Sequence, residues 1–203
     1  MILHGNKNDL AATPRREILR YMGYRKEAPE EPAARIDAVW EALLEAAEPA
    51  AVFRKFPLER EDGMLTIGGC PFRSRALEKN LSGCGSVYLM SATLGWEVDA
   101  RIRRAAWSDA LTQLIAQAVG AAMAEEWCSR VNETIRREAA PDLCRPRFSP
   151  GFGDLDLSYQ KYFQQLLKMD RAVGIRLTET MMMLPVKSVT TLIGVMKAPE
   201  EGD

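Results

Sequence analysis

The longest periodic segment of the chain, residues 107–138, constrains the fold more than any other feature. Apolar side chains recur along it at helical spacing, beginning with Leu111, Leu114, Ile115 and Ala118. Repeats at intervals of three and four residues indicate an α-helix with one apolar face. Because such a face is stable only against another apolar layer, we expect this helix to pack across a sheet.

The candidate strands are short apolar runs that lie between helical segments. Residues 86–94 form a continuous apolar run, which is typical of a strand at the centre of a sheet. The other candidate strands are residues 51–57, 64–67, 175–183 and 189–196. They do not alternate regularly with helices, as the strands of a doubly wound parallel sheet do. The pattern therefore predicts an α+β fold, with long helices packed on a mainly antiparallel twisted sheet.

The first fifty residues show helical patterns only. Thr13-Pro14 has the form of a helix N-cap followed by proline in the first helical position. Apolar residues at helical spacing predict a second helix from Ala33 to Ala47. We therefore expect a single domain, in which a helical N-terminal extension at residues 1–50 precedes the α+β domain at residues 51–203.

Charge and hydropathy exclude several classes of protein. Lys and Arg total 27 and Asp and Glu total 28, so the formal net charge is -1 and gives no broad reason to bind nucleic acid. No window approaches the roughly 20 apolar residues of a membrane-spanning helix, and the N-terminus has no secretory pattern. We therefore expect a cytoplasmic protein that contacts neither nucleic acid nor membrane.

The cysteines and the histidine limit the chemistry. The four cysteines form no Cys-x-x-Cys pair, and His4 is the single histidine. Zinc sites need closely spaced Cys or His ligands, and most hydrolytic nucleophiles need a histidine beside them. We therefore expect no metal-ligating and no catalytic residues in this chain.

The segment from Arg147 to Asp154 is the best candidate for a binding loop. Arg147 offers a planar fork of donors suited to a carboxylate or a phosphate. Two glycines and a proline follow it, and glycine lets a ligand approach the backbone closely. The same residues also suit a purely structural turn, so the loop alone leaves both interpretations open.

The residues that follow the loop extend the pattern. The order Arg147-x-x-x-Gly151-Phe152, an amphipathic helix, Gly174-Ile175-x-Leu177-Thr178-Glu179-Thr180 and Pro185-x-x-Ser188-Val189 resembles the C-terminal activation domain of cobalamin-dependent methionine synthase. That family has an Arg-x-x-x-Gly-Tyr loop, a helix, a Gly-x-x-Leu-Thr-Glu-Ser strand and a Pro-x-x-Ser-Val strand start. The resemblance is clear over residues 147–189 and reaches more loosely back to about Ala118. The segment from Arg20 to Tyr24 and the region from Leu94 to Ala122 look similar to a free-standing version of the domain.

The resemblance implies an accessory function in a methionine synthase (methyltransferase) system of methionine biosynthesis. Family members bind S-adenosylmethionine and present it to a corrinoid that has been oxidised to inactive cob(II)alamin. An electron-donor protein reduces the cobalt, and S-adenosylmethionine remethylates it. The cobalamin would be held by a partner, a corrinoid-binding methyltransferase or the methionine synthase modules. Whether the chain is itself an enzyme is left open by the resemblance.

The resemblance also implies the site residues. Arg147 would bind the carboxylate of S-adenosylmethionine, Pro150 and Gly151 would line its pocket, and Phe152 would face the ligand or the corrinoid. Two positions depart from the family: Phe152 replaces its tyrosine, and a glutamate of its long helix falls at Ala121. Its tyrosine-bearing segment after the last strand also has no counterpart before Asp203. These departures favour an alternative, a docking module for a corrinoid protein that does not bind S-adenosylmethionine.

Overall fold

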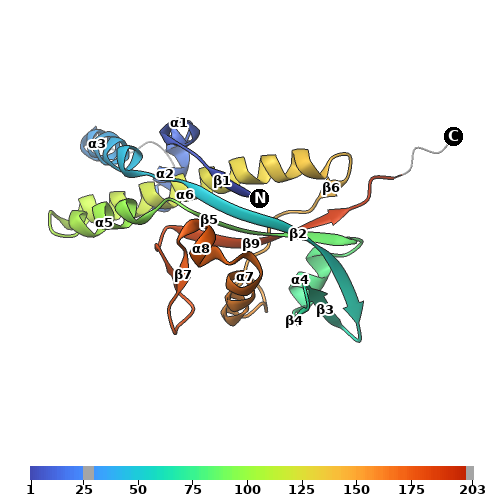
Figure 1. Ribbon diagram of the computed structural model, residues 1–203. Coiled ribbons are helices and arrows are strands. Elements are labelled where there is room, and N and C mark those ends of the chain that lie inside the picture. Colours follow the sequence, from blue (N-terminus) through green and yellow to red (C-terminus); the bar gives the residue numbers. More distant parts are fainter. Residues whose placement is uncertain (25–29, 200–203) are drawn as a thin grey trace.

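An antiparallel sheet forms the middle layer of the molecule (Figure 1). The computed structural model describes residues 1–24 and 30–199, and within them the sheet has seven strands. Their order is β4-β3-β2-β5-β9-β6, and β1 pairs with the outer edge of β2. The bounds are β1 Ile2–His4, β2 Ala50–Glu61, β3 Met64–Ile67, β4 Cys70–Phe72, β5 Ser86–Thr93, β6 Leu143–Cys144 and β9 Ser188–Met196.

The central strand is β5, as its continuous apolar run predicts. It pairs along its whole length with β2 on one side and β9 on the other. Every residue from Val87 to Thr93 is buried, because helices cover both faces of the sheet there. Tyr88 and Met90 contribute to the core on one face, whereas Val87 and Leu89 contribute to the core on the other.

The longest helix, α6 (Ala110–Ala139), lies across one face of the sheet. The same layer contains α1 (Lys7–Leu10), α2 (Arg15–Tyr21), α3 (Glu30–Ala46) and α5 (Trp96–Ala105). Asp109 caps α6, because its side chain accepts a hydrogen bond from the backbone N–H of Thr112 at 2.9 Å. The helix therefore begins three residues later than predicted, and Trp107 lies in the turn before it.

Shorter elements cover the opposite face. These are α4 (Arg75–Asn80), the 3-10 turn η1 (Leu157–Tyr159), α7 (Gln160–Leu167) and α8 (Met169–Val173). Phe72, Leu77, Phe163 and Leu167 meet beneath the sheet in a second apolar core. The α+β fold with a mainly antiparallel sheet is thus confirmed. No helix among the described residues has the length and apolar character needed to cross a bilayer.

The segment 175–183 is where the strand prediction was wrong. It is a hairpin of two short strands, β7 (Arg176–Leu177) and β8 (Met183–Leu184), separate from the main sheet. Met181 has a φ of +64°, and the N–H of Thr178 bonds to the carbonyl of Met182 at 2.9 Å. The chain therefore turns back where a continuous strand was expected, because local hydrogen bonds close a tight turn.

The first fifty residues contain a strand and a short helix, β1 and α1, that the helical pattern did not indicate. Strand β1 pairs with β2, in the register Ile2 to Val52 and His4 to Ala50. A three-residue strand is too short to show a period of two, which explains why it was missed. Helices α2 and α3 pack on α6 and share its core. The division into an extension at residues 1–50 and a domain at residues 51–203 stays a prediction.

Candidate functional site

A cleft of about 590 Å³ opens between α6, strand β9 and the loop that follows β6. Three of its nine lining residues come from the polar edge of α6, and four come from the loop. Two side chains of β9 also line it, at the edge of the sheet. The lining residues are Glu125, Asn132, Arg136, Pro146, Arg147, Ser149, Phe152, Val189 and Thr191.

Backbone hydrogen bonds hold the loop against β9. Phe148 donates to the carbonyl of Leu192 at 2.9 Å, and Leu192 donates in return to the carbonyl of Phe148 at 2.7 Å. The hydroxyl of Thr191 adds a third bond to Phe148, at 3.0 Å. The loop thus continues the sheet edge by one residue pair, which fixes the position of the neighbouring Arg147.

A tight turn follows, and it requires glycine. Gly151 has a φ of +93°, a conformation that residues with a side chain rarely adopt. The carbonyl of Ser149 accepts from the N–H of Phe152 at 3.1 Å, and Gly151 donates to Leu155 at 2.8 Å. Pro150 is buried in this turn, whereas Phe152 is 62% exposed.

Asp154 fixes the far end of the loop to α4. Its carboxylate accepts hydrogen bonds from the hydroxyl of Ser74 and from the N–H groups of Arg75 and Ala76, at 2.8 and 3.0 Å. These bonds, that of Ser74 foremost, lower the pKa of Asp154 to about 2. Gly153 passes so close to α4 that a Cβ there would lie 2.7 Å from that of Ala76. Both ends of the loop are therefore anchored.

The guanidinium of Arg147 forms an ion pair with the carboxylate of Glu125 on α6. The Arg147 side chain is 24% exposed and that of Glu125 is 43% exposed, so the pair lies at the cleft wall with access to solvent. Cys128 lies beside the pair and is fully buried. Burial raises the pKa of its thiol to about 12, against the smaller lowering effect of Arg147. Cys128 is consequently an uncharged neighbour, while Arg147 and Glu125 carry opposite charges.

The structure thus places two of the four predicted site residues in the cleft wall and the other two in the turn between them. Arg147 and Phe152 line the same cleft. Pro150 and Gly151 shape the turn between them and are not among its lining residues. Ala121 lies one helical turn before Glu125 on α6. The assignment of these residues to ligand binding stays a prediction.

Sequence reasoning missed the contribution of α6 to the cleft. Glu125, Asn132 and Arg136 follow one another at intervals of seven and four residues, which places them on one face of a helix. That spacing was a usable signal, but nothing local indicated which segment the face would meet. Within the described part of the chain, the Oδ1 atom of Asn132 is buried without a hydrogen-bond partner.

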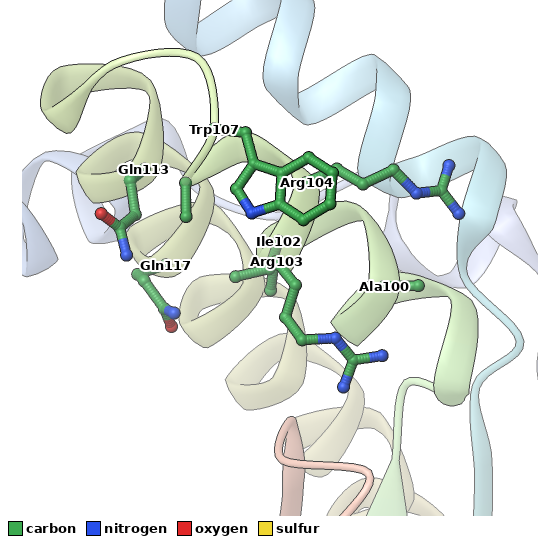
Figure 2. A pocket seen from close by; sticks show the side chains of 8 residues that line it. Ala100, Ile102, Arg103, Arg104, Trp107, Gln113 and Gln117 are labelled. Atoms are coloured by element: carbon green, nitrogen blue, oxygen red, sulfur yellow. The ribbon is translucent and has the colours of Figure 1, made fainter.

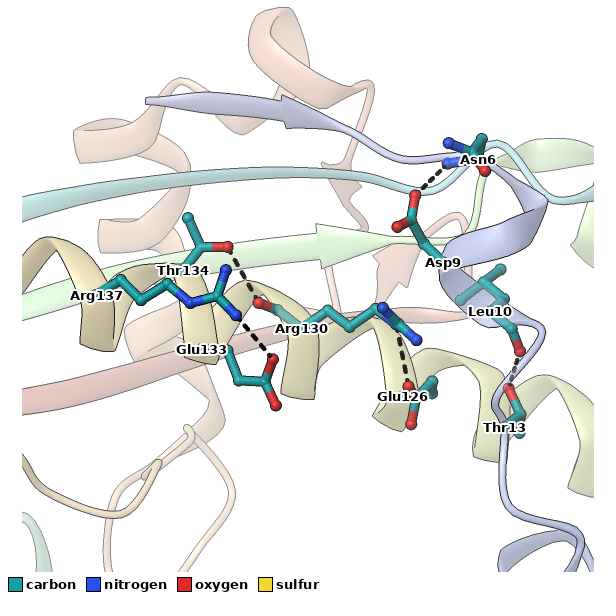
Figure 3. Close-up of polar contacts among 9 residues, drawn as sticks. All are labelled: Asn6, Asp9, Leu10, Thr13, Glu126, Arg130, Glu133, Thr134 and Arg137. Carbon is teal, nitrogen blue, oxygen red and sulfur yellow. Dashed lines mark hydrogen bonds and ion pairs between the residues drawn. The ribbon is translucent and has the colours of Figure 1, made fainter.

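Two other clefts differ from this one, because their ion pairs lie within a single helix. One, of about 480 Å³, lies between α5 and the start of α6 beside Trp107 (Figure 2). The other, of about 250 Å³, lies between the N-terminal segment and α6, and it includes His4. Figure 3 shows that its charged groups pair with near neighbours, as Arg130 does with Glu126 at 3.1 Å and Arg137 with Glu133 at 3.8 Å.

Fold and cleft together define the class: an α+β domain in which a long helix and an anchored loop frame a cleft over the last strand. Residues 84–200, more than half of the chain, match the family model described as vitamin B12 dependent methionine synthase, activation domain. The chain belongs to this family, and the resemblance deduced from the sequence is confirmed.

The solved structures agree on the fold. The chain is similar to a structure titled as the MetH reactivation domain bound to AdoHcy, with a TM-score of 0.73 and 16% sequence identity. The similarity covers 100% of this chain and 80% of that one. A search among curated proteins gave no match.

Proposed function

We propose that this protein acts in the reductive reactivation of a corrinoid-dependent methyltransferase such as methionine synthase, by holding S-adenosylmethionine in the Arg147 cleft. Its family membership and the location of the cleft inside the matched residues, 84–200, support this. The observation that carries the proposal is that Arg147 and Phe152 line one cleft on a loop anchored at both ends. The similar solved structure holds AdoHcy, which has the same adenosyl and amino-acid groups as S-adenosylmethionine.

The chain contributes binding and orientation. A partly buried guanidinium binds a carboxylate more strongly than an exposed one, because less water screens the charges. Arg147 therefore orients the amino-acid end of S-adenosylmethionine, and the exposed ring of Phe152 offers an apolar face to the adenine or to the corrinoid. Holding the methyl donor in one orientation is the main contribution that a protein makes to such a transfer.

Partners supply the remaining chemistry in this proposal. A corrinoid-binding methyltransferase or methionine synthase modules would hold the cobalamin that serves as methyl acceptor, and an electron-donor protein would supply the one electron that its reduction requires. The proposal therefore requires two protein partners and a cytoplasmic setting in which all three meet.

A second function rests on a specific observation. Glu125 already pairs with one nitrogen of the Arg147 guanidinium, and Ala121 and Phe152 lack the polar groups of the family at those positions. A docking module that recognises the corrinoid protein without S-adenosylmethionine is consistent with these features.

Calorimetric titration of S-adenosylmethionine into the purified protein separates the two functions. We expect saturable binding by the wild type. Arg147→Ala should weaken it about tenfold to hundredfold, because a hydrogen bond to a charged group contributes roughly 1.5–3 kcal/mol. Arg103→Ala, an exposed arginine of α5 outside the cleft, is the matched control and should bind as the wild type does. Absence of wild-type binding would leave the docking function in its place.

A further inference from the structure

The ion pair of Arg147 and Glu125 leaves binding capacity unused on both partners. The contact joins one guanidinium nitrogen, Nη2, to one carboxylate oxygen, Oε1. A guanidinium has five N–H donors and a carboxylate has two acceptor oxygens, so a second partner can bind each group without breaking the pair. Both side chains line the cleft and are partly exposed, which makes these positions accessible to a ligand.

We infer that Glu125 binds the α-ammonium group of the ligand, so that Arg147 and Glu125 together recognise the zwitterionic end of an α-amino acid. The inference rests on the proposed function, because it concerns the same ligand in the same cleft. The ammonium and carboxylate groups of an α-amino acid are attached to a single carbon atom. Their receptor must therefore present a cation and an anion side by side, which is the arrangement of this pair.

The other residues of the cleft favour Glu125 for this role. Among the nine residues that line it, Glu125 is the sole carboxylate, and Arg136 adds a second positive charge. An ammonium group in the cleft would face two guanidinium groups without Glu125. Ala121, one helical turn earlier, has no polar side-chain atom with which to replace it.

Glu125 has a second, opposing effect on the same ligand. Its carboxylate is held by Arg147 in this structure, so it competes with the carboxylate of an incoming ligand. For a ligand with an α-ammonium group, the new contact outweighs this competition. For a ligand without that group, only the competition acts. Neutralising Glu125 should therefore weaken the binding of a ligand that has an α-ammonium group and should not weaken the binding of a ligand that lacks it.

The test compares wild type and Glu125→Gln by calorimetry with two ligands, S-adenosylhomocysteine and its analogue in which hydrogen replaces the α-amino group. We expect the wild type to prefer S-adenosylhomocysteine by about tenfold or more, as loss of one charge-assisted contact implies. Glu125→Gln should lose this preference, and it should bind the des-amino analogue at least as tightly as the wild type does. Glu133→Gln, an exposed glutamate on α6 outside this cleft, should keep the wild-type preference.

Two results would overturn the inference while leaving the proposed function in place. The first is a full preference for S-adenosylhomocysteine in Glu125→Gln. The second is tighter binding of S-adenosylhomocysteine by that variant, which would make Glu125 a competitor only. If the wild type bound neither ligand, the proposed function itself would be wrong, and the inference with it. Thermal unfolding of each variant checks that the fold is intact.

Discussion

The cleft at Arg147 and the cleft at Trp107 have similar volumes, about 590 and 480 Å³, but they are built in different ways. Residues between 125 and 191, from three separate elements, line the first. Residues between 100 and 117, from two consecutive helices and their turn, line the second (Figure 2). The first cleft is therefore a product of tertiary structure, whereas the second follows from a local bend of the chain.

The charged groups of the two clefts also differ in whether they come from one element or from several. In the Trp107 cleft, Arg104 pairs at 3.0 Å with Glu97 of its own helix, and Trp107 is 91% exposed. In the Arg147 cleft, the opposite charges come from different elements and are held by an anchored backbone. A preorganised pair of charges loses less entropy when it binds a ligand than mobile side chains do. Volume alone would not have distinguished these clefts.

The largest effect should come from the anchored loop. Gly153→Ala should cost about 2–5 kcal/mol of unfolding free energy, because a left-handed conformation costs roughly 1–2 kcal/mol and overpacking about 1–3. The new Cβ would lie 2.7 Å from Ala76. Gly63→Ala, also at positive φ but with nothing within 4 Å, should show the conformational part alone. If chemical denaturation gave the same loss of unfolding free energy for both variants, contact with α4 would not be what fixes the loop.

The next effect concerns the guanidinium itself. Arg147→Lys keeps the positive charge but loses the planar fork, so it should recover only part of the affinity lost in Arg147→Ala. That loss is about tenfold to hundredfold. Titration of S-adenosylmethionine into both variants measures the difference. Full recovery by lysine would mean that charge alone, and not the fork, binds the carboxylate.

A smaller effect is expected from pH at Asp154. Its pKa is lowered from 3.8 to about 2, so its ionised form stabilises the folded state. This contribution is complete above about pH 5, where the carboxyl is ionised in both states, and is lost progressively as the pH falls through the folded-state value. The melting temperature of Asp154→Asn should therefore lie below that of wild type at neutral pH, and the gap should close in acid. A difference in melting temperature that does not change with pH would show that ionisation of Asp154 is not its cause.

The smallest effect should be that of Trp107→Ala. An exposed side chain outside buried networks changes the unfolding free energy by less than about 0.5 kcal/mol. Thermal unfolding and S-adenosylmethionine titration should both resemble those of the wild type. Loss of ligand binding in this variant would reverse the comparison and place the ligand in the α5–α6 cleft.

The sequence by itself determined the long helix α6, the central strand β5 and the α+β class. Periodicity reports which face of a segment is buried, and a continuous apolar run reports burial on both faces. The ordered motifs from Arg147 to Val189 also carried the family, because their spacing is visible along the chain.

Only the tertiary structure decided what each face meets. The partner of Arg147 is Glu125, 22 positions away, and Asp154 caps a helix that begins 79 positions earlier. Neither pairing leaves a local signature, since a periodic pattern marks an exposed polar edge without saying which segment will lie against it. Long-range packing brings these groups together, and the Arg147 cleft exists only in the folded chain. The hairpin β7–β8 is a local exception, because hydrogen bonds between Thr178 and Met182, four positions apart, close its turn.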